Sequence, residues 1–229
     1  LINLNKILSN NLDKTYKNNA VIRIKKIEKN NWSKNKKDLT SKTSKDKNII
    51  PITPNWLMMT LAENISSNNI VVEEALVSSR SLLNFLPFKN HKDFYGLASG
   101  GIGWAVSGCI GVSLANKNKT IVAIIGDGSS MYAIQSIWTA AHYNLPIIYV
   151  IANNQSYRII KERLEGFHNN TNFVGMDFNK PKIDFVKIAN SMGVEATQVS
   201  EPKSLKSLFK KAFKYKKPYL IEVMVDKGY

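Results

Sequence analysis

An aspartate between two glycines is the feature of this sequence best suited to chemistry. Asp127 stands between Gly126 and Gly128, directly after the β-branched run at residues 121–125. Such a run predicts a buried strand, and the glycines permit the tight turn that must follow it. The amphipathic pattern that begins at Ser129 predicts a helix after this turn. The carboxylate of Asp127 is therefore expected at the carboxyl end of a strand, beside the free amides of a helix start.

A second polar strand end lies further along the chain. The apolar run at residues 147–152 ends at Asn153 and Asn154. Ligands bind outside the carboxyl ends of parallel strands, so Asp127 and Asn154 can converge there. One carboxylate, one amide oxygen, glycine amides and a helix start are what a hard cation holding a diphosphate requires. The simpler explanation of Gly-Asp-Gly on its own is a turn that ends a strand.

The order Gly-Asp-Gly-Ser and then Asn-Asn resembles the thiamine-diphosphate motif. The likeness continues through residues 136–146, which look like the matching segment of benzoylformate decarboxylase-like enzymes, and upstream through residues 100–105. It covers roughly residues 51–225, the diphosphate-binding domain of that superfamily. Acetolactate synthases, oxalyl-CoA decarboxylases and indolepyruvate decarboxylases share the motif, so it identifies the cofactor far better than the substrate.

The resemblance implies thiamine diphosphate and Mg²⁺ as cofactors. It assigns the metal to the side chains of Asp127 and Asn154 and to the main-chain carbonyl of Ser156. A single carboxylate suits this role because the diphosphate brings negative charge of its own. The amides of Gly128 and Ser129 point at the incoming anion, and Gly126 allows the close backbone approach that a side chain would block.

The segment around Gly100 implies the other half of the cofactor site. In the resembled family, the carbonyl two residues before an apolar wedge accepts a hydrogen bond from the aminopyrimidine. That places the carbonyl on Gly100 and the wedge on Ile102, which bends the cofactor. The alternative is an ordinary helix start with Ile102 in the core.

Two further pairs of residues are weaker candidates. Ser78 and Ser79 follow the first strand and could bond the diphosphate. Ile159 and Ile160 match positions that line the substrate pocket in the resembled decarboxylases, and ordinary helix packing explains them nearly as well.

Two arginines depart from the resembled pattern. Arg158 and Arg163 stand where a benzoylformate decarboxylase is expected to have glycine and phenylalanine. The departure puts an aromatic substrate in doubt and favours an anionic one. No catalytic residue is assigned in this chain, because the family's activating glutamate belongs to a separate pyrimidine-binding domain, and Glu73 and Glu74 lie at the wrong end of the architecture.

The alternation of apolar periods predicts the fold class: α/β, three-layer, with a mostly parallel sheet of about six strands and helices on both faces. Residues 1–48 are expected to form a basic helical tail whose residues 32–47 are linker, and residues 49–229 the thiamine-diphosphate-binding domain. The expected strands are at residues 70–72, 94–98, 121–125, 147–152, 194–199 and 219–225, and the expected helices at residues 54–65, 81–85, 102–115, 130–143, 183–192 and 205–215.

The formal net charge of +15 does not by itself indicate nucleic acid. Residues 1–50 hold 13 Lys or Arg against 4 Asp or Glu, and seven further lysines suit the solvated face of a helix at residues 203–217. No nucleic-acid-binding motif appears. No apolar run is long enough to cross a membrane, no signal-peptide pattern begins at Leu1, and the single cysteine, Cys109, suits a reducing compartment. We therefore expect a cytoplasmic protein with neither a nucleic-acid nor a membrane partner.

The function implied by the resemblance is decarboxylation of a 2-oxo acid by ylid addition, with this chain as the diphosphate- and Mg²⁺-binding part. Catalysis needs a pyrimidine-binding domain, on the same longer chain or on another subunit, within a homodimer or homotetramer. We expect the chain to be the carboxyl-terminal part of a longer polypeptide; the alternative is a natural short subunit with a disordered basic arm. Other hypotheses are an acetolactate synthase-like carboligase, a subunit of a split 2-oxo acid decarboxylase, and a non-catalytic nucleotide-binding module.

Overall fold

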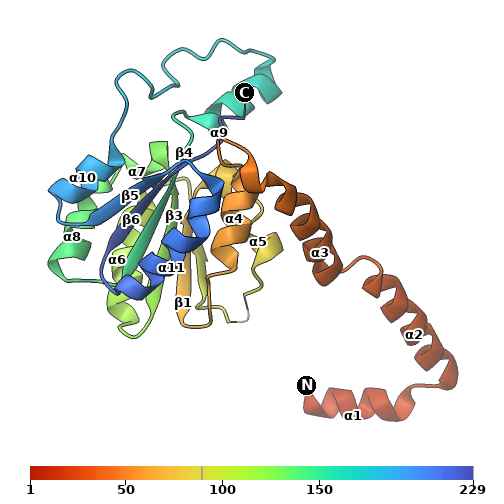
Figure 1. Cartoon of the computed structure of the whole chain (residues 1–229). Coiled ribbons are helices and arrows are strands. Elements are labelled where there is room, and N and C mark those ends of the chain that lie inside the picture. The colour runs from red at the N-terminus through yellow and green to blue at the C-terminus, as the bar shows by residue number, and fades with distance from the viewer. Residues whose placement is uncertain (89, 229) are drawn as a thin grey trace. The chain divides into compact units, whose positions relative to one another are not determined.

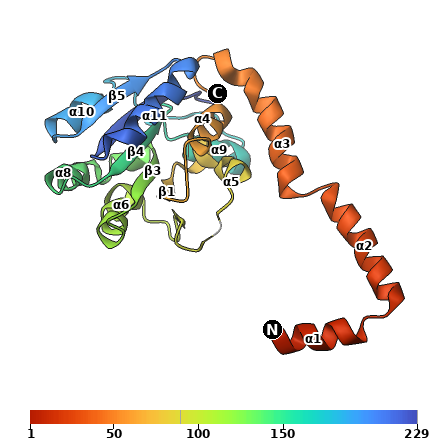
Figure 2. The ribbon, with the colours of Figure 1, turned by 60° about the horizontal axis from the view of Figure 1, so that its bottom comes forward.

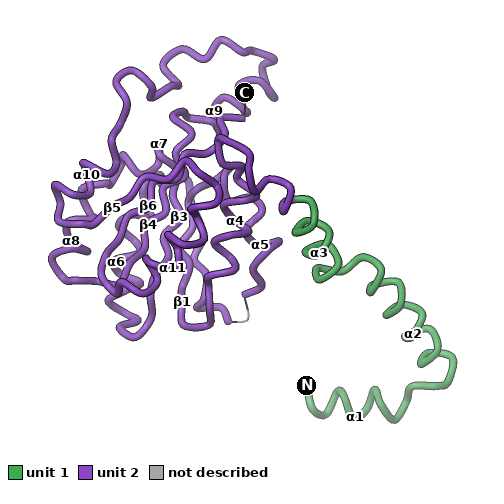
Figure 3. The backbone as a smooth tube through the Cα atoms, in the orientation of Figure 1, with its two compact units in different colours: residues 1–42 green, residues 43–229 purple. Residues whose placement is uncertain are grey.

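The computed structural model describes residues 1–88 and 90–228. The chain forms two compact units, residues 1–42 and residues 43–229 (Figure 3). Among the described helices, none combines the length and the apolar character needed to span a membrane.

The first unit consists of helices that bury little surface. Its elements are α1 (Ile2–Asn11), α2 (Lys14–Glu28) and α3 (Trp32–Thr43), and neither α1 nor α2 has a buried residue. The segment expected to be a linker, residues 32–47, is helical: α3 and the 3₁₀ turn η1 (Ser44–Asn48) occupy it. The segment contains neither proline nor glycine, and the Asn31 side chain accepts a hydrogen bond from the Lys34 amide at 2.9 Å, which favours a helix start.

The second unit is built on a six-stranded sheet in which every pair of neighbours is parallel. Its central strands are continuous apolar runs, as expected where a parallel sheet is covered on both faces. This confirms the predicted fold class. In spatial order the strands are β2 (Phe94–Gly96), β1 (Asn69–Glu74), β3 (Thr120–Gly126), β4 (Ile147–Asn153), β6 (Tyr219–Met224) and β5 (Glu195–Val199).

Helices cover both faces of the sheet, which gives three layers (Figures 1 and 2). On one face α6 (Trp104–Ala115), α8 (Ile137–His142) and α10 (Phe185–Ser191) share a core with alternate residues of β1, β3 and β4. The helices α4 (Pro54–Ala62), α5 (Leu82–Phe85) and α11 (Leu205–Tyr215) bury side chains on the other side of the sheet. The remaining elements are α7 (Asp127–Ser130), α9 (Arg158–His168) and the 3₁₀ turns η2 (Leu76–Ser79), η3 (Ile134–Ser136) and η4 (Pro202–Ser204).

The prediction of a single helix at residues 130–143 is wrong. The helical turn α7 ends after Ser130, and η3 and α8 follow it as separate pieces. The Ser130 hydroxyl donates to the carbonyl of Asp127 at 2.7 Å, and Ala133 leaves helical geometry with φ −146°. A serine that bonds back to the main chain competes with helix propagation, so the chain turns here.

The helix expected from residue 102 begins two residues later. Gly103 takes a left-handed conformation, with φ 88°, and α6 starts at Trp104. The Glu74 carboxylate, fully buried at the end of β1, accepts hydrogen bonds from the amides of Gly103 at 2.5 Å and Ala105 at 2.8 Å. Glu74 therefore caps α6 and fixes the loop that precedes it.

Candidate cofactor site

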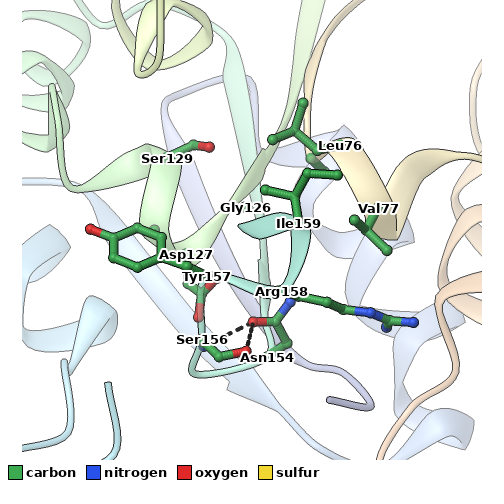
Figure 4. Close-up of a pocket in the computed structure, with 12 residues that line it drawn as sticks. Leu76, Val77, Gly126, Asp127, Ser129, Asn154, Ser156, Tyr157, Arg158 and Ile159 are labelled. Carbon is green, nitrogen blue, oxygen red and sulfur yellow. Dashed lines mark hydrogen bonds between the residues drawn. The ribbon is translucent and has the colours of Figure 1, made fainter. Parts of the chain in front are cut away.

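The carboxyl ends of β3 and β4 bring Asp127 and Asn154 to the same edge of the sheet. The two strands are in register, with Gly126 opposite Ala152, so the residues that follow them emerge together. A pocket opens at this edge (Figure 4). Its lining comes from three chain segments: Ala75, Leu76 and Val77 after β1; Gly126, Asp127, Gly128 and Ser129 at the end of β3; and Asn154, Ser156, Tyr157, Arg158 and Ile159 after β4.

The pocket lies where the strand order reverses. From β1 the chain adds β2 on one side and then crosses to add β3 on the other side. The loops that leave β1 and β3 therefore diverge, and a crevice forms between them. In open parallel sheets this switch point is where ligands bind.

Asp127 is a buried carboxylate with one unpaired oxygen. Its side chain is 3% exposed, and Oδ2 has no hydrogen-bond partner among the described residues. Burial raises the pKa of Asp127 to about 7, although the nearby amides of Gly128, Gln155 and Ser156 act in the opposite direction. A buried anionic oxygen without a donor is what a cation would satisfy, so the pocket fits a metal ion at this position.

Asn154 and Ser156 lie beside Asp127 on the same side of the pocket (Figure 4). The side-chain oxygen Oδ1 of Asn154 accepts hydrogen bonds from the Ser156 amide at 2.9 Å and from the Ser156 hydroxyl at 3.2 Å. Both residues are buried, and Ser156 also pairs with Asp177 in an isolated antiparallel bridge. The loop is therefore held in one shape beside the carboxylate, and a cation that binds Asn154 Oδ1 would replace one of its two hydrogen bonds from Ser156.

The turn α7 supplies backbone amides to the same pocket. Gly126, Gly128 and Ser129 all line it. A Cβ atom at Gly128 would stand 2.7 Å from the Tyr157 ring, and that ring meets Phe178 edge-on with 4.4 Å between centroids. Glycine is required at position 128 because the two aromatic side chains pack directly against its α-carbon.

The residues expected to bind the far end of the cofactor do not line this pocket. Gly100 lies in the exposed loop before α6, with open space where a side chain would stand. Ile102 is 45% exposed, so the alternative that placed it in the core is wrong. Gly100 and Ile102 are both exposed in one loop, and their roles in binding the cofactor stay predictions.

Of the weaker candidates, the two serines do not line the pocket and only one of the two isoleucines does. Ser78 and Ser79 are buried within η2 and do not line the pocket; the Ser79 hydroxyl donates instead to the Glu73 carboxylate. Ile159 faces the pocket, whereas Ile160 is 42% exposed. Their part in binding stays a prediction.

The two arginines differ in whether they line the pocket. Arg158 lines the pocket, with its guanidinium bonded to Glu162 at 3.1 Å and to the Asp226 carbonyl at 3.3 Å. Arg163 lies on the exposed side of α9 over the Phe167 ring. Only Arg158 lies at the pocket.

Sequence reasoning missed two parts of the site. Leu76 and Val77 line the pocket opposite Asp127, and Leu76 has the left-handed φ of 49°, which is unusual for a branched residue. Glu222, a carboxylate in the apolar strand β6, is bonded to Asn153. The sequence did contain a signal for Glu222, because an acid in the middle of an apolar strand requires a buried partner.

Comparison with known proteins agrees with the geometry. Residues 78–223 match the family model described as thiamine pyrophosphate enzyme, C-terminal TPP binding domain. The chain is 28% identical to a benzoylformate decarboxylase of Pseudomonas aeruginosa, over 76% of this chain and 32% of that protein. It is 30% identical to an acetolactate synthase large subunit of Cyanidium caldarium, over 62% of this chain and 24% of that protein.

Solved structures show the same architecture. A thiamine diphosphate-dependent 4-hydroxybenzoylformate decarboxylase of Rhodococcus jostii superposes with a TM-score of 0.72 at 30% identity, covering 77% of this chain and 33% of that one. The benzoylformate decarboxylase of Polynucleobacter necessarius gives a TM-score of 0.72 at 28% identity, covering 80% and 34%. The chain therefore belongs to the family of thiamine pyrophosphate enzymes, as their C-terminal cofactor-binding domain. It spans about a third or less of the length of the curated relatives described here.

Proposed function

We propose that the pocket binds the diphosphate of thiamine diphosphate through Mg²⁺. The observation that carries the proposal is the buried, unpaired Oδ2 of Asp127 at the pocket wall. Asn154 Oδ1 and the main-chain carbonyl of Ser156 would complete the protein ligands. The amides of Gly128 and Ser129 would face the phosphate oxygens.

The activity proposed for the protein is conversion of a 2-oxo acid, with decarboxylation as the first reaction. When bound, thiamine diphosphate supplies the electron sink that decarboxylation needs. The described residues would contribute binding and orientation: the carboxyl ends of β3 and β4 would hold the diphosphate, and Gly100 and Ile102 would orient the ring of the cofactor. The relatives named as decarboxylases and acetolactate synthases support this class of reaction.

The site requires a second domain to act. Because the chain spans about a third of its relatives, we propose that a pyrimidine-binding domain, on the same longer polypeptide or on another subunit, supplies the activating glutamate. The exposure of Ile102 supports a contact outside this domain. We propose assembly as a homodimer or homotetramer in the cytoplasm.

Calorimetry of thiamine diphosphate binding, with and without Mg²⁺, tests the proposal. It compares the wild type with Asp127→Ala, in the presence of the pyrimidine-binding partner. We expect metal-dependent binding by the wild type and a loss of at least about tenfold in affinity for the variant, since removing a ligand leaves the metal with neutral donors.

A matched control is Glu201→Ala, which removes an exposed carboxylate away from the pocket and should bind as the wild type does. Equal affinity of Asp127→Ala and the wild type, or binding that does not depend on the metal, would contradict the proposed site.

A further inference from the structure

Glu222 is a buried carboxylate that the proposed cofactor chemistry does not use directly. It lies in the middle of β6 with 1% of its surface exposed. The ion pairs found among the described residues do not include it. Burial raises the pKa of Glu222, and amide donors from Gln198 and Asn153 offset part of the effect. A buried acid that forms no ion pair requires other polar partners.

The pleat of the sheet places three polar side chains on one face. Gln198 of β5 and Ile151 of β4 both stand opposite Glu222, and Asn153 follows Ile151 by two residues. Since side chains alternate along a strand, Gln198, Glu222 and Asn153 point to the same side. Asn153 Nδ2 donates to Glu222 Oε1 at 2.6 Å, and Gln198 Nε2 donates to Glu222 Oε2 at 2.9 Å.

The bond to Glu222 also fixes which way the amide of Asn153 faces. With Nδ2 turned to the carboxylate, Oδ1 of Asn153 accepts a hydrogen bond from the Gln155 amide at 2.9 Å. A reversed amide would set an oxygen against the carboxylate and an NH₂ group against an N–H donor. Gln155 has the left-handed φ of 58°, so this bond holds a strained turn between the two strand-end residues and Ser156.

The two adjacent asparagines therefore have different surroundings. Asn153 faces the interior and joins Glu222, whereas Asn154 lines the pocket and holds the amide of Ser156. The first connects the interior of the sheet to the loop, and the second presents the loop to the ligand.

We propose that Glu222 is a positioning residue for cofactor binding, acting through Asn153 to hold the loop that carries Asn154 and the Ser156 carbonyl. The proposal rests on the proposed function of that loop. Groups that orient metal ligands without touching the metal typically change metal affinity by about 10- to 100-fold when they are removed.

The chemistry of the network distinguishes hydrogen bonding from bulk. Glu222→Met keeps the length of the side chain and removes both acceptors. Glu222→Gln keeps one acceptor for Asn153, and its new NH₂ group finds an acceptor if the amide of Gln198, an exposed residue, rotates. Glu222→Gln should therefore retain the positioning effect, and Glu222→Met should lose it.

The test measures metal affinity rather than turnover. Mn²⁺ replaces Mg²⁺, and the EPR signal of free Mn²⁺ is followed during titration of the protein, together with the pyrimidine-binding partner, in saturating thiamine diphosphate. We expect Mn²⁺ affinity to fall by about 10- to 100-fold in Glu222→Met and to stay within about threefold of the wild type in Glu222→Gln. Glu195→Met, which removes a surface carboxylate from the neighbouring strand β5, is the matched control and should bind as the wild type does.

A double-mutant cycle with Asn153→Ala shows whether the effect passes through Asn153. In that background Glu222→Met should cause no further loss of metal affinity. Folded Glu222→Met protein with wild-type affinity, an equal loss in Glu222→Gln, or full additivity with Asn153→Ala would each overturn the proposal. If Glu222→Met does not fold, Glu222→Leu takes its place, because it also removes both acceptors and fills most of the same volume.

The failure of the proposed function has a separate signature. A wild-type protein that binds no Mn²⁺ in the presence of thiamine diphosphate and the pyrimidine-binding partner contradicts the cofactor assignment itself. A wild-type protein that binds normally, beside variants that do not differ from it, contradicts only the role of Glu222.

Discussion

The ring of Tyr157 packs directly on the α-carbon of Gly128, with Cε1 at 2.7 Å from the place a Cβ atom would occupy. This contact joins the turn after β3 to the loop after β4, the two segments that carry Asp127 and Asn154. Side-chain packing, besides backbone hydrogen bonds, therefore sets the width of the pocket.

Gly128→Ala should force these two loops apart. The added methyl group overpacks the contact, for which we expect a loss of about 1–3 kcal/mol in the free energy of unfolding and a weaker affinity for thiamine diphosphate. Urea denaturation and calorimetry measure the two effects. Gly111→Ala is the control: it lies within α6 with open space around it, and the change should be neutral or stabilising by up to about 1 kcal/mol. Unchanged stability and affinity in Gly128→Ala would show that the Tyr157 ring moves away from position 128 without cost, which would contradict the prediction.

Asp127 should make the stability of the metal-free protein fall as the pH rises. Its pKa is raised from 3.8 to about 7 in the fold, so between these values the unfolded chain has released a proton that the folded chain keeps. Its favourable contribution is complete below about pH 4 and is lost as the pH rises through about 7.

In Asp127→Asn, the free energy of unfolding should not fall in this way as the pH rises, because the amide does not titrate. Relative to the wild type, the variant should gain on the order of 2–4 kcal/mol in unfolding free energy between pH 4 and pH 8. Denaturation curves at a series of pH values, with chelator present, measure the difference. Parallel pH profiles for the two proteins would contradict the buried, unpaired carboxylate.

Glu74→Gln should loosen the start of α6. The carboxylate accepts from both Gly103 and Ala105, and an amide has only one oxygen to offer them. A buried N–H left without an acceptor costs about 1–3 kcal/mol. Denaturation should show that loss, and hydrogen exchange should speed up at the first amides of the helix. Glu63→Gln, on the surface beside Lys206, should change stability by less than about 1 kcal/mol, and an equal effect of the two changes would contradict the cap.

Cys109 should be inert in the folded protein. The thiol is fully buried in α6, and burial raises its pKa to about 12, so almost no thiolate exists at pH 8. Iodoacetamide should leave the native protein unlabelled and modify it once in denaturant, as mass spectrometry would show. Rapid labelling of the native protein would mean that the face of the sheet covered by α6 opens readily.

The strands and the sheet class were predictable because buried parallel strands are continuous β-branched runs. Residues 121–125 and 147–152 carry that pattern without ambiguity, and both strands lie where it predicts. The convergence of Asp127 and Asn154 followed from the same rule, since parallel strands end at one edge. The prediction of one continuous helix at residues 130–143 was wrong, because periodicity cannot show that the Ser130 hydroxyl bonds back to the main chain.

The supporting residues of the site were beyond sequence reasoning for a different reason. Glu222 and Asn153 are separated by 69 residues, and their contact depends on which strand lies beside β4. Ser78 and Ser79 were expected at the pocket, but η2 turns Leu76 and Val77 toward it and buries both hydroxyls. Local pattern predicts which elements form, whereas the direction of each loop side chain depends on the assembled sheet.

The position of β6 has a consequence for the order of folding. Among the described residues it is the last strand in sequence, yet it lies between β4 and β5 and is the strand with which β5 pairs. During synthesis the residues of the pocket leave the ribosome well before β6, so β4 keeps an open apolar edge until β6 has emerged. Such an edge is a template for aggregation. A chain interrupted before Tyr219 would therefore carry Asp127 and Asn154 and still expose the edge of β4, which would make it a substrate for chaperones.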